Sequence, residues 1–251
     1  ILDIFWRNGP ILSRIDRTSI TVCVFGIFIV LLAAIAVWFH DLTTIFSNWY
    51  VSPISVILCI LFMGAIYMIY LSNRHGSVGE NKDESSTDSY DGYSVTKAFT
   101  VYLIAATIVV ITAIWLAQIG DQLATVMNWK ASFVGTQFLA FITSLPELAT
   151  SFAALRLNAP ELAITNVLGS NLFNMSFVLL LDDLAYTKGV VWTAVSNIHS
   201  ITAIIAIVMT LVVLVSLMIQ PRKRLGKYLT YEACLLIMLY IIGSVVTFIL
   251  P

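Results

Sequence analysis

Long apolar stretches separated by short polar linkers dominate the sequence. Runs of roughly 18–25 apolar residues are long enough to cross a lipid bilayer as helices. The chain contains seven such stretches, at about residues 18–40, 53–72, 97–119, 132–156, 161–182, 198–220 and 230–250. The pattern therefore predicts an all-α, polytopic membrane protein with about seven transmembrane helices.

The composition agrees with a membrane protein and narrows the functional classes. Hydrophobic residues make up 59% of the 251 residues and charged residues only 11%, whereas soluble domains carry roughly 25% charged residues. The formal net charge of -1 gives no indication of nucleic-acid binding. Cys23, Cys59 and Cys234 all fall inside apolar runs without metal-ligand spacing, so we interpret them as packing residues. No cofactor is indicated.

The basic residues are distributed unequally between the two sides that alternating spans define. Arg and Lys residues concentrate on the cytoplasmic side of membrane proteins. One side carries eleven of them and the other only Lys130 and Lys188. This asymmetry predicts that the N-terminal residues and the linker at 73–96 are cytoplasmic and that the C-terminus is outside.

The linker at residues 73–96 is rich in Gly, Ser, Asp and Glu and is typical of a mobile loop. Its acidic residues could bind calcium in a regulatory role. They lack the Asp-x-Asp-x-Asp-Gly pattern of an EF-hand loop, so a solvated linker is the favoured interpretation.

Two polar stripes interrupt the apolar helices at 132–156 and 161–182. Their members recur at spacings of three and four residues, which place side chains on one helix face. The first stripe contains Ala140, Thr143, Ser144, Glu147 and Ser151, and the second contains Asn166, Ser170 and Asn174. Polar stripes on membrane helices face each other or a cavity rather than lipid.

Pro146 and Glu147 give the first stripe its chemical character. Proline breaks a helix because it lacks an N–H and clashes with the carbonyl of residue 142. Glu147 and Ser170 each lie roughly 17 Å from the turn near Asn158, at about 1.5 Å rise per residue. Both are thus near the middle of a bilayer core about 30 Å thick, the depth at which transporters bind their substrates at broken helices.

The ligands available on the two stripes are carboxylate, hydroxyl, amide and backbone carbonyl oxygens. Hard cations such as calcium, sodium and magnesium prefer oxygen, while softer metals prefer sulfur or imidazole. Neither stripe contains His or Cys. Glu147 has no basic partner near it in the sequence, so its charge requires a cation or a proton.

Other polar residues of the same spans have structural interpretations. We expect Thr150, Ser151, Thr165 and Ser176 to make interhelical hydrogen bonds. Glu161 follows Asn158 and Pro160 in a helix-capping pattern. The carboxylates expected near the outer surface, as solvated helix ends, are Asp121, Asp182 and Asp183.

Except for Ser151, the two polar stripes lie within two continuous sequence motifs. These are Gly-Thr-Gln-Phe-Leu-Ala-Phe-Ile-Thr-Ser-Leu-Pro-Glu-Leu at 135–148 and Asn-Val-Leu-Gly-Ser-Asn-Leu-Phe-Asn at 166–174. Together they resemble the second α-repeat of the calcium/cation antiporter superfamily, of the prokaryotic sodium/calcium exchanger type. The motif itself covers about 50 residues. Members of this family have ten helices in two inverted five-helix halves, and the spans found here fit helices four to ten.

The resemblance implies a domain organisation and a site. Residues 1–72 would end the N-terminal half, 73–96 would be the acidic cytoplasmic loop, and 97–251 would be the C-terminal half, with its α-repeat hairpin at 132–182. Thr143, Ser144 and Glu147 would coordinate the metal ion. The remaining ion-binding groups would be the carbonyl of Ala140 and the side chains of Ser170 and Asn174.

Two features depart from the family pattern. No second Pro-Glu motif occurs in the chain, so a first α-repeat is absent and would have to be supplied by N-terminal helices as a partner. Asn174 stands where some relatives carry aspartate, and Ile142 where glycine is common. Fewer carboxylates at the site leave ion preference and stoichiometry open.

The resemblance implies a secondary antiporter, not an enzyme, that exports calcium in exchange for sodium across a prokaryotic plasma membrane. A calcium/proton antiporter is the alternative, with Glu147 binding calcium and a proton in turn. A cation channel would instead show filter carbonyls from several subunits, and a fragment without transport activity is a further possibility. Membrane lipid and inorganic cations are the expected partners.

Overall fold

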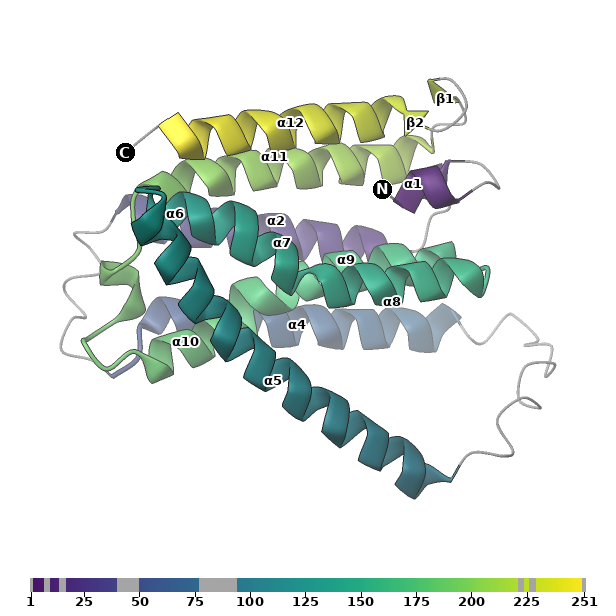
Figure 1. Cartoon of the computed structure of the whole chain (residues 1–251). Helices are drawn as coiled ribbons and strands as arrows, with labels where there is room; N and C mark the ends of the chain where they lie inside the picture. The colour runs from purple at the N-terminus through teal and green to yellow at the C-terminus, as the bar shows by residue number, and fades with distance from the viewer. Residues whose placement is uncertain are drawn as a thin grey trace. The chain divides into compact units, whose positions relative to one another are not determined.

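The computed structural model describes residues 2–6, 10–13, 17–39, 50–76, 94–220, 224–225 and 229–249, and these are almost entirely helical (Figure 1). The α-helices are α1 (Leu2–Phe5), α2 (Arg17–Trp38), α4 (Pro53–Gly76), α5 (Val95–Val126), α6 (Ala131–Val134), α7 (Ala140–Thr143), α8 (Leu145–Arg156), α9 (Pro160–Phe173), α10 (Leu179–Ala185), α11 (Ile198–Ile219) and α12 (Tyr231–Ile249). The other elements are the 3₁₀ turns η1 (Ile11–Ser13) and η4 (Val191–Thr193), the π-helical turns η2 (Gly135–Leu139) and η3 (Asn174–Val178), and the antiparallel strands β1 (Arg224–Leu225) and β2 (Leu229–Thr230).

Six helical stretches of the described residues are apolar and long enough to cross a membrane. They are Thr18–Trp38, Pro53–Leu71, Val95–Val126, Pro160–Ala185, Ile198–Ile219 and Tyr231–Ile249. A bent pair, Gly135–Thr143 with Leu145–Arg156, adds a seventh span when it is counted as one. The prediction of an all-α membrane protein with about seven spans is confirmed.

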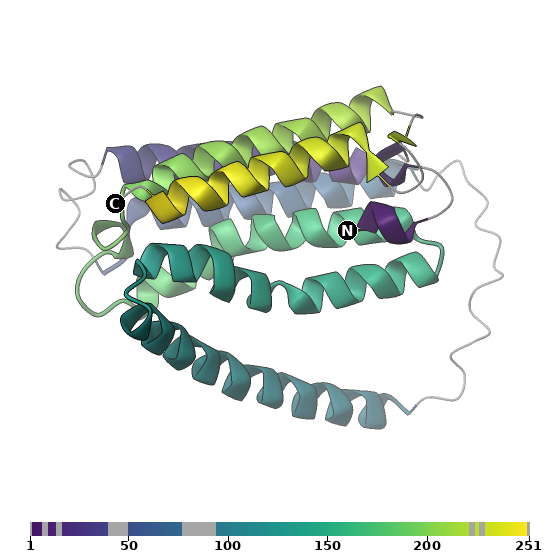
Figure 2. The same ribbon diagram turned by 45° about the horizontal axis from the view of Figure 1, so that its top comes forward.

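The chain divides into two compact units, one of residues 1–73 with 144–251 and the other of residues 74–143. In the first unit α2 packs against α9 and α11, α12 packs against α11, and α8 packs against α9. Figure 2 shows α11 and α12 running side by side. Of the predicted acidic linker at 73–96, residues 77–93 lie outside the described residues.

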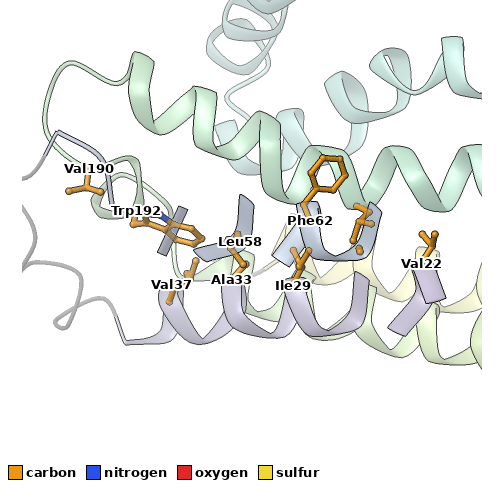
Figure 3. Close-up of a cluster of buried hydrophobic side chains, with 11 residues drawn as sticks. Val22, Ile29, Ala33, Val37, Leu58, Phe62, Val190 and Trp192 are labelled. Carbon is orange, nitrogen blue, oxygen red and sulfur yellow. The ribbon is translucent and has the colours of Figure 1, made fainter. Parts of the chain in front are cut away.

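The main core of the first unit forms around α2 and α4 (Figure 3). Small residues of α2, including Ala33 and Ala36, are buried there, and small side chains let membrane helices approach closely. The larger members are Val22, Ile29, Val37, Leu58, Phe62, Leu172, Val190 and Trp192. The core thus joins buried residues of α2 and α4 to Leu172, Val190 and Trp192, which lie more than 100 residues later in the sequence.

Within the first unit, segments that the alternating order of spans places on the same side of the membrane contact each other. Asp3 accepts hydrogen bonds from the backbone N–H groups of Ile11, at 3.2 Å, and of Thr230, at 3.1 Å. At the other end of the spans, the residues before α4 contact Asp183, at the end of α10. These contacts support the order of spans on which the topology prediction depends.

Asp183 corrects one expectation from the sequence, because it is completely buried rather than solvated. Its Oδ2 accepts hydrogen bonds from the backbone N–H of Ser52, at 2.6 Å, and the hydroxyl of Ser55, at 2.8 Å. Its Oδ1 accepts from the N–H of Val191 at 2.8 Å. Three donors offset the cost of burying the charge. Asp121 and Asp182 are exposed, as expected.

The second unit contains α5, α6, η2 and α7. A turn at Asn128, with φ of 52°, reverses the chain between α5 and α6. Gly120 of α5 lies against Leu139, the last residue of η2, and a Cβ at Gly120 would come within 3.0 Å of the Leu139 Cδ2 atom. The rings of Trp129, in the turn between α5 and α6, and of Phe138, in η2, are stacked with their centroids 5.6 Å apart. This contact holds η2 against the turn.

Candidate functional site

The predicted helix break lies at Ser144, between α7 and α8. Ser144 has φ and ψ of -88° and 0°, and α8 begins at Leu145 with Pro146 in its first turn. Because Pro146 has no N–H, the carbonyl of residue 142 lacks its intrahelical donor. The Thr143 hydroxyl donates to the carbonyls of Leu139, at 2.8 Å, and Ala140, at 3.2 Å. The sequence prediction of a broken helix is therefore confirmed.

A π-helical turn accompanies each of the two polar stripes. η2 ends at Leu139, immediately before Ala140, and η3 begins at Asn174. π-Helical turns are rare and occur frequently at functional sites. Nothing in the residue pattern signals them, because a single wide turn leaves the hydrophobic periodicity of a short segment almost unchanged.

The Glu147 carboxylate has an unusual environment on α8. Its Oε2 atom is buried and has no hydrogen-bond partner among the described residues. A buried carboxylate oxygen without a donor is costly, and most buried polar atoms in proteins have a partner. A cation or a proton at this oxygen would remove the cost.

Asn166 of α9 contacts the turn of α8 that carries Glu147. Its Nδ2 donates to the Glu147 backbone carbonyl at 3.1 Å, to the Thr150 hydroxyl at 2.8 Å and to the Ser151 hydroxyl at 3.1 Å. Asn166 belongs to the second polar stripe but is not among the ion ligands predicted from the sequence. The structure shows that it is the polar link between the two helices at the level of Glu147.

The other predicted ligands of α9 lie further along the same face. Ser170 is half-buried and its hydroxyl donates to the Val167 carbonyl at 3.1 Å, which leaves its oxygen lone pairs available. Asn174 is exposed at the start of η3. Both follow Asn166 at spacings of four residues, so the stripe predicted for this helix runs from the Glu147 turn towards η3.

The predicted ligands Ala140, Thr143 and Ser144 are all exposed. Ala140 and Thr143 belong to the second compact unit, whereas Ser144 begins the part of the chain that joins the first. The Ser144 carbonyl accepts the N–H of Leu148 at 3.1 Å and so starts the first turn of α8. The structure thus brings Glu147 and the α9 stripe together within one unit.

The residues interpreted as interhelical contacts behave as such in most cases. The buried Ser151 hydroxyl donates to the Ala163 carbonyl at 3.2 Å, and the hydroxyls of Ser19 and Thr165 are 3.1 Å apart, joining α2 to α9. Ser176 instead bonds to its own helix, at the Leu172 carbonyl. Ser151 and Thr165 therefore fix the packing beneath the candidate site rather than contributing ligands.

The turn between α8 and α9 differs in one detail from the capping pattern. Asn158 has φ of 56°, and its N–H donates to the Leu155 carbonyl, so it terminates α8. α9 begins at Pro160 after Ala159, whose own side chain makes no cap hydrogen bond. Asparagine tolerates this left-handed conformation better than most residues, which explains its place there. Glu161 lies in the first turn of α9, where an acidic side chain complements the helix dipole.

The described residues contain no group of three or more His, Cys, Asp or Glu side chains that could hold a metal ion. A cation at this hairpin would therefore be held by one carboxylate with hydroxyl, amide and carbonyl oxygens. Such a donor set suits a hard cation that binds weakly enough to be released.

Comparison with known proteins gives consistent matches. The model of the family described as sodium/calcium exchanger protein matches residues 97–249. The chain is 31% identical over 145 residues to the sodium/calcium exchanger MaX1 of Methanosarcina acetivorans, covering 57% of this chain and 41% of that protein. It is 25% identical over 158 residues to the inner membrane protein YrbG of Escherichia coli, covering 61% of this chain and 48% of the relative.

A further relative is the bovine sodium/potassium/calcium exchanger 1, 27% identical over 133 residues, which cover 52% of this chain and 11% of that protein. The matched regions span about half the length or less of these relatives. No solved structure matches the chain significantly. Because the family model covers more than half of the sequence, the chain belongs to the sodium/calcium exchanger family of integral membrane transporters.

Proposed function

We propose that this protein is a secondary antiporter that exports calcium in exchange for sodium, with the α8–α9 hairpin as part of its ion site. The observation that carries the proposal is the buried Glu147 Oε2, which has no hydrogen-bond partner among the described residues. A buried carboxylate oxygen without a donor on an apolar helix hairpin is stabilised when a cation or a proton occupies it. Membership of an exchanger family favours the cation.

The proposed ligand set combines this carboxylate with neutral oxygens. Glu147, Thr143 and Ser144 would be the principal ligands from the broken span, with the Ala140 carbonyl beside them. Ser170 and Asn174 would complete the set from α9 and η3. The broken helix at Ser144 supports this assignment because helix breaks expose carbonyl oxygens to a cation at membrane depth.

A calcium/proton antiporter is the second candidate, and Asn174 is the residue that favours it. An amide at this position leaves Glu147 as the sole carboxylate of the hairpin's polar stripes. In this candidate Glu147 would bind calcium and a proton in turn. The two candidates differ in the gradient that drives transport and can be separated by it.

The proposal includes a partner and an orientation. A first α-repeat with its own Pro-Glu motif would face Glu147 and supply the second carboxylate. In this arrangement residues 1–72 and 97–251 belong to two halves of the exchanger, joined by the acidic loop. The eleven-to-two distribution of basic residues supports a cytoplasmic loop and an external C-terminus in a prokaryotic plasma membrane.

The test is calcium-45 uptake into vesicles containing the full-length protein, driven in turn by a sodium gradient and by a pH gradient. We expect sodium-driven uptake that Glu147→Gln abolishes. Uptake driven only by the pH gradient would select the calcium/proton candidate. Wild-type uptake by the Glu147→Gln variant would contradict the role of Glu147, and uptake without any opposing gradient would indicate a channel.

A further inference from the structure

We propose that Asn166 is a positioning residue for the ion site: its side-chain amide fixes the turn of α8 that carries Glu147, so that the carboxylate stays available to a cation. This inference rests on the proposed function and adds to it a residue on the neighbouring helix. The contact that defines it is the 3.1 Å hydrogen bond from Asn166 Nδ2 to the Glu147 backbone carbonyl.

The chemistry of the contact fixes the orientation of the amide. A backbone carbonyl can only accept a hydrogen bond, so the nitrogen side of the Asn166 amide must face α8. The same nitrogen lies 2.8 Å from the Thr150 hydroxyl and 3.1 Å from that of Ser151. All three acceptors around Nδ2 are on α8. The hydrogen bonds of this amide nitrogen therefore all run from a donor on α9 to acceptors on α8.

The hydroxyls of Thr150 and Ser151 can accept a hydrogen bond from Asn166, because each donates its own proton to a backbone carbonyl. The Thr150 hydroxyl donates to the carbonyls of Pro146, at 3.1 Å, and Glu147, at 3.0 Å. The Ser151 hydroxyl donates to the Ala163 carbonyl at 3.2 Å. Both hydroxyls can then act as acceptors, and the two hydrogens of Nδ2 are shared among three acceptors, the Glu147 carbonyl and these hydroxyls. The resulting network includes the carbonyls of both residues of the Pro-Glu motif.

This network has a consequence for the Glu147 carboxylate. The amide of Asn166 donates to the backbone carbonyl of Glu147, not to its carboxylate. Oε2 has no partner among the described residues. The network holds the first turn of α8, which contains Pro146, and leaves the Glu147 carboxylate available to a cation.

The position of Asn166 along α9 also relates Glu147 to the other proposed ligands on that helix. Side chains of a helix lean towards its N-terminus, so the Glu147 side chain leans away from the α8–α9 turn. Ser170 and Asn174 lie one and two helical turns beyond Asn166 in that same direction. The hydrogen bond from Asn166 to the Glu147 backbone therefore determines the position of the carboxylate along the hairpin relative to Ser170 and Asn174.

The experiment compares Asn166→Ala with Asn171→Ala in the full-length protein. Asn171 is an exposed asparagine of the same helix and lies outside this network. Loss of a residue that orients a ligand typically weakens metal affinity 10- to 100-fold. We expect Asn166→Ala to raise the calcium concentration for half-maximal transport at least roughly tenfold, and Asn171→Ala to leave it within about twofold.

Two further measurements separate positioning from a purely structural role. Calcium-dependent thermal stabilisation, followed by tryptophan fluorescence, reports binding independently of transport, and it should need a correspondingly higher calcium concentration in Asn166→Ala. Asn166→Gln retains the amide donors on a longer side chain and should fall between wild type and Asn166→Ala. It also serves as the test variant if Asn166→Ala does not fold.

The outcomes distinguish this inference from the proposed function. If Glu147→Gln abolishes calcium transport but folded Asn166→Ala keeps the wild-type half-maximal concentration, the positioning role of Asn166 is wrong and the proposed site stands. If Glu147→Gln transports calcium as wild type does, the proposed function itself fails. A lower unfolding temperature in Asn166→Ala with unchanged calcium dependence would likewise reduce Asn166 to a structural contact.

Discussion

The backbone N–H of Ser52 donates a 2.6 Å hydrogen bond to the Asp183 carboxylate, across 131 residues of sequence. Ser52 directly precedes α4, so Asp183 acts as the N-terminal cap of a helix in another part of the chain. The hydroxyl of Ser55, which also donates to Asp183, accepts a 2.9 Å hydrogen bond from the Trp192 ring. One buried carboxylate thereby joins α4, α10 and η4.

Replacing this carboxylate should destabilise the protein without affecting ion coordination directly. Asp183→Asn removes a charge that accepts three hydrogen bonds and places an amide against at least one N–H donor. We expect it to lower the free energy of unfolding by about 2–4 kcal/mol, measured by denaturation in detergent. Asp182→Asn, at the exposed neighbouring position, is the control and should stay close to wild type. Equal effects at the two positions would contradict the capping role.

The sequence predicts the spans well because apolar length is a local property. The break at Ser144 was predictable for the same reason, since Pro146 removes a hydrogen bond wherever its helix packs. The burial of Asp183 was not, because its donors come from segments at 52–55 and 191. The role of Asn166 likewise depends on the register of α8 against α9, which the spacing within one helix does not determine.

The unpartnered oxygen of Glu147 makes a prediction about stability. Glu147→Gln removes a buried charge whose Oε2 has no donor among the described residues, so little stabilising interaction is lost. We expect an unfolding temperature equal to or above that of the wild type in calcium-free buffer, together with loss of the rise that calcium produces. Thermal scans with and without calcium measure both. A marked drop in the calcium-free unfolding temperature would show that the carboxylate has a protein partner.

Asn174 is the position at which the ion site can be strengthened. Asn174→Asp adds a carboxylate to an oxygen ligand set, and calcium affinity rises with the charge of its ligands. We expect calcium to bind roughly tenfold more tightly, which corresponds to about 1.4 kcal/mol. Asn171→Asp adds the same charge at an exposed position three residues earlier and should change affinity much less. The same gain in both variants would assign the effect to general electrostatics.

The topology can be tested at two turns that carry the same residue type. Asn128, between α5 and α6, and Asn158, between α8 and α9, are exposed residues with positive φ. Span order places the first outside and the second in the cytoplasm. In a background without the three native cysteines, a cysteine at residue 128 should react with an impermeant thiol reagent added to intact cells. A cysteine at residue 158 should react only after permeabilisation. The reverse labelling pattern would show that the protein has the opposite orientation in the membrane.

The last prediction concerns the number of carboxylates needed for transport. The polar stripes of the hairpin contain one carboxylate, Glu147, whereas a dehydrated divalent cation at membrane depth requires further neutralisation. We therefore expect vesicles that contain residues 1–251 alone to show no calcium flux under a sodium or a pH gradient. Addition of a half with a first α-repeat should restore the flux. Robust flux from residues 1–251 alone would contradict this, and would instead indicate a site formed by two copies of the chain, each contributing its own Glu147.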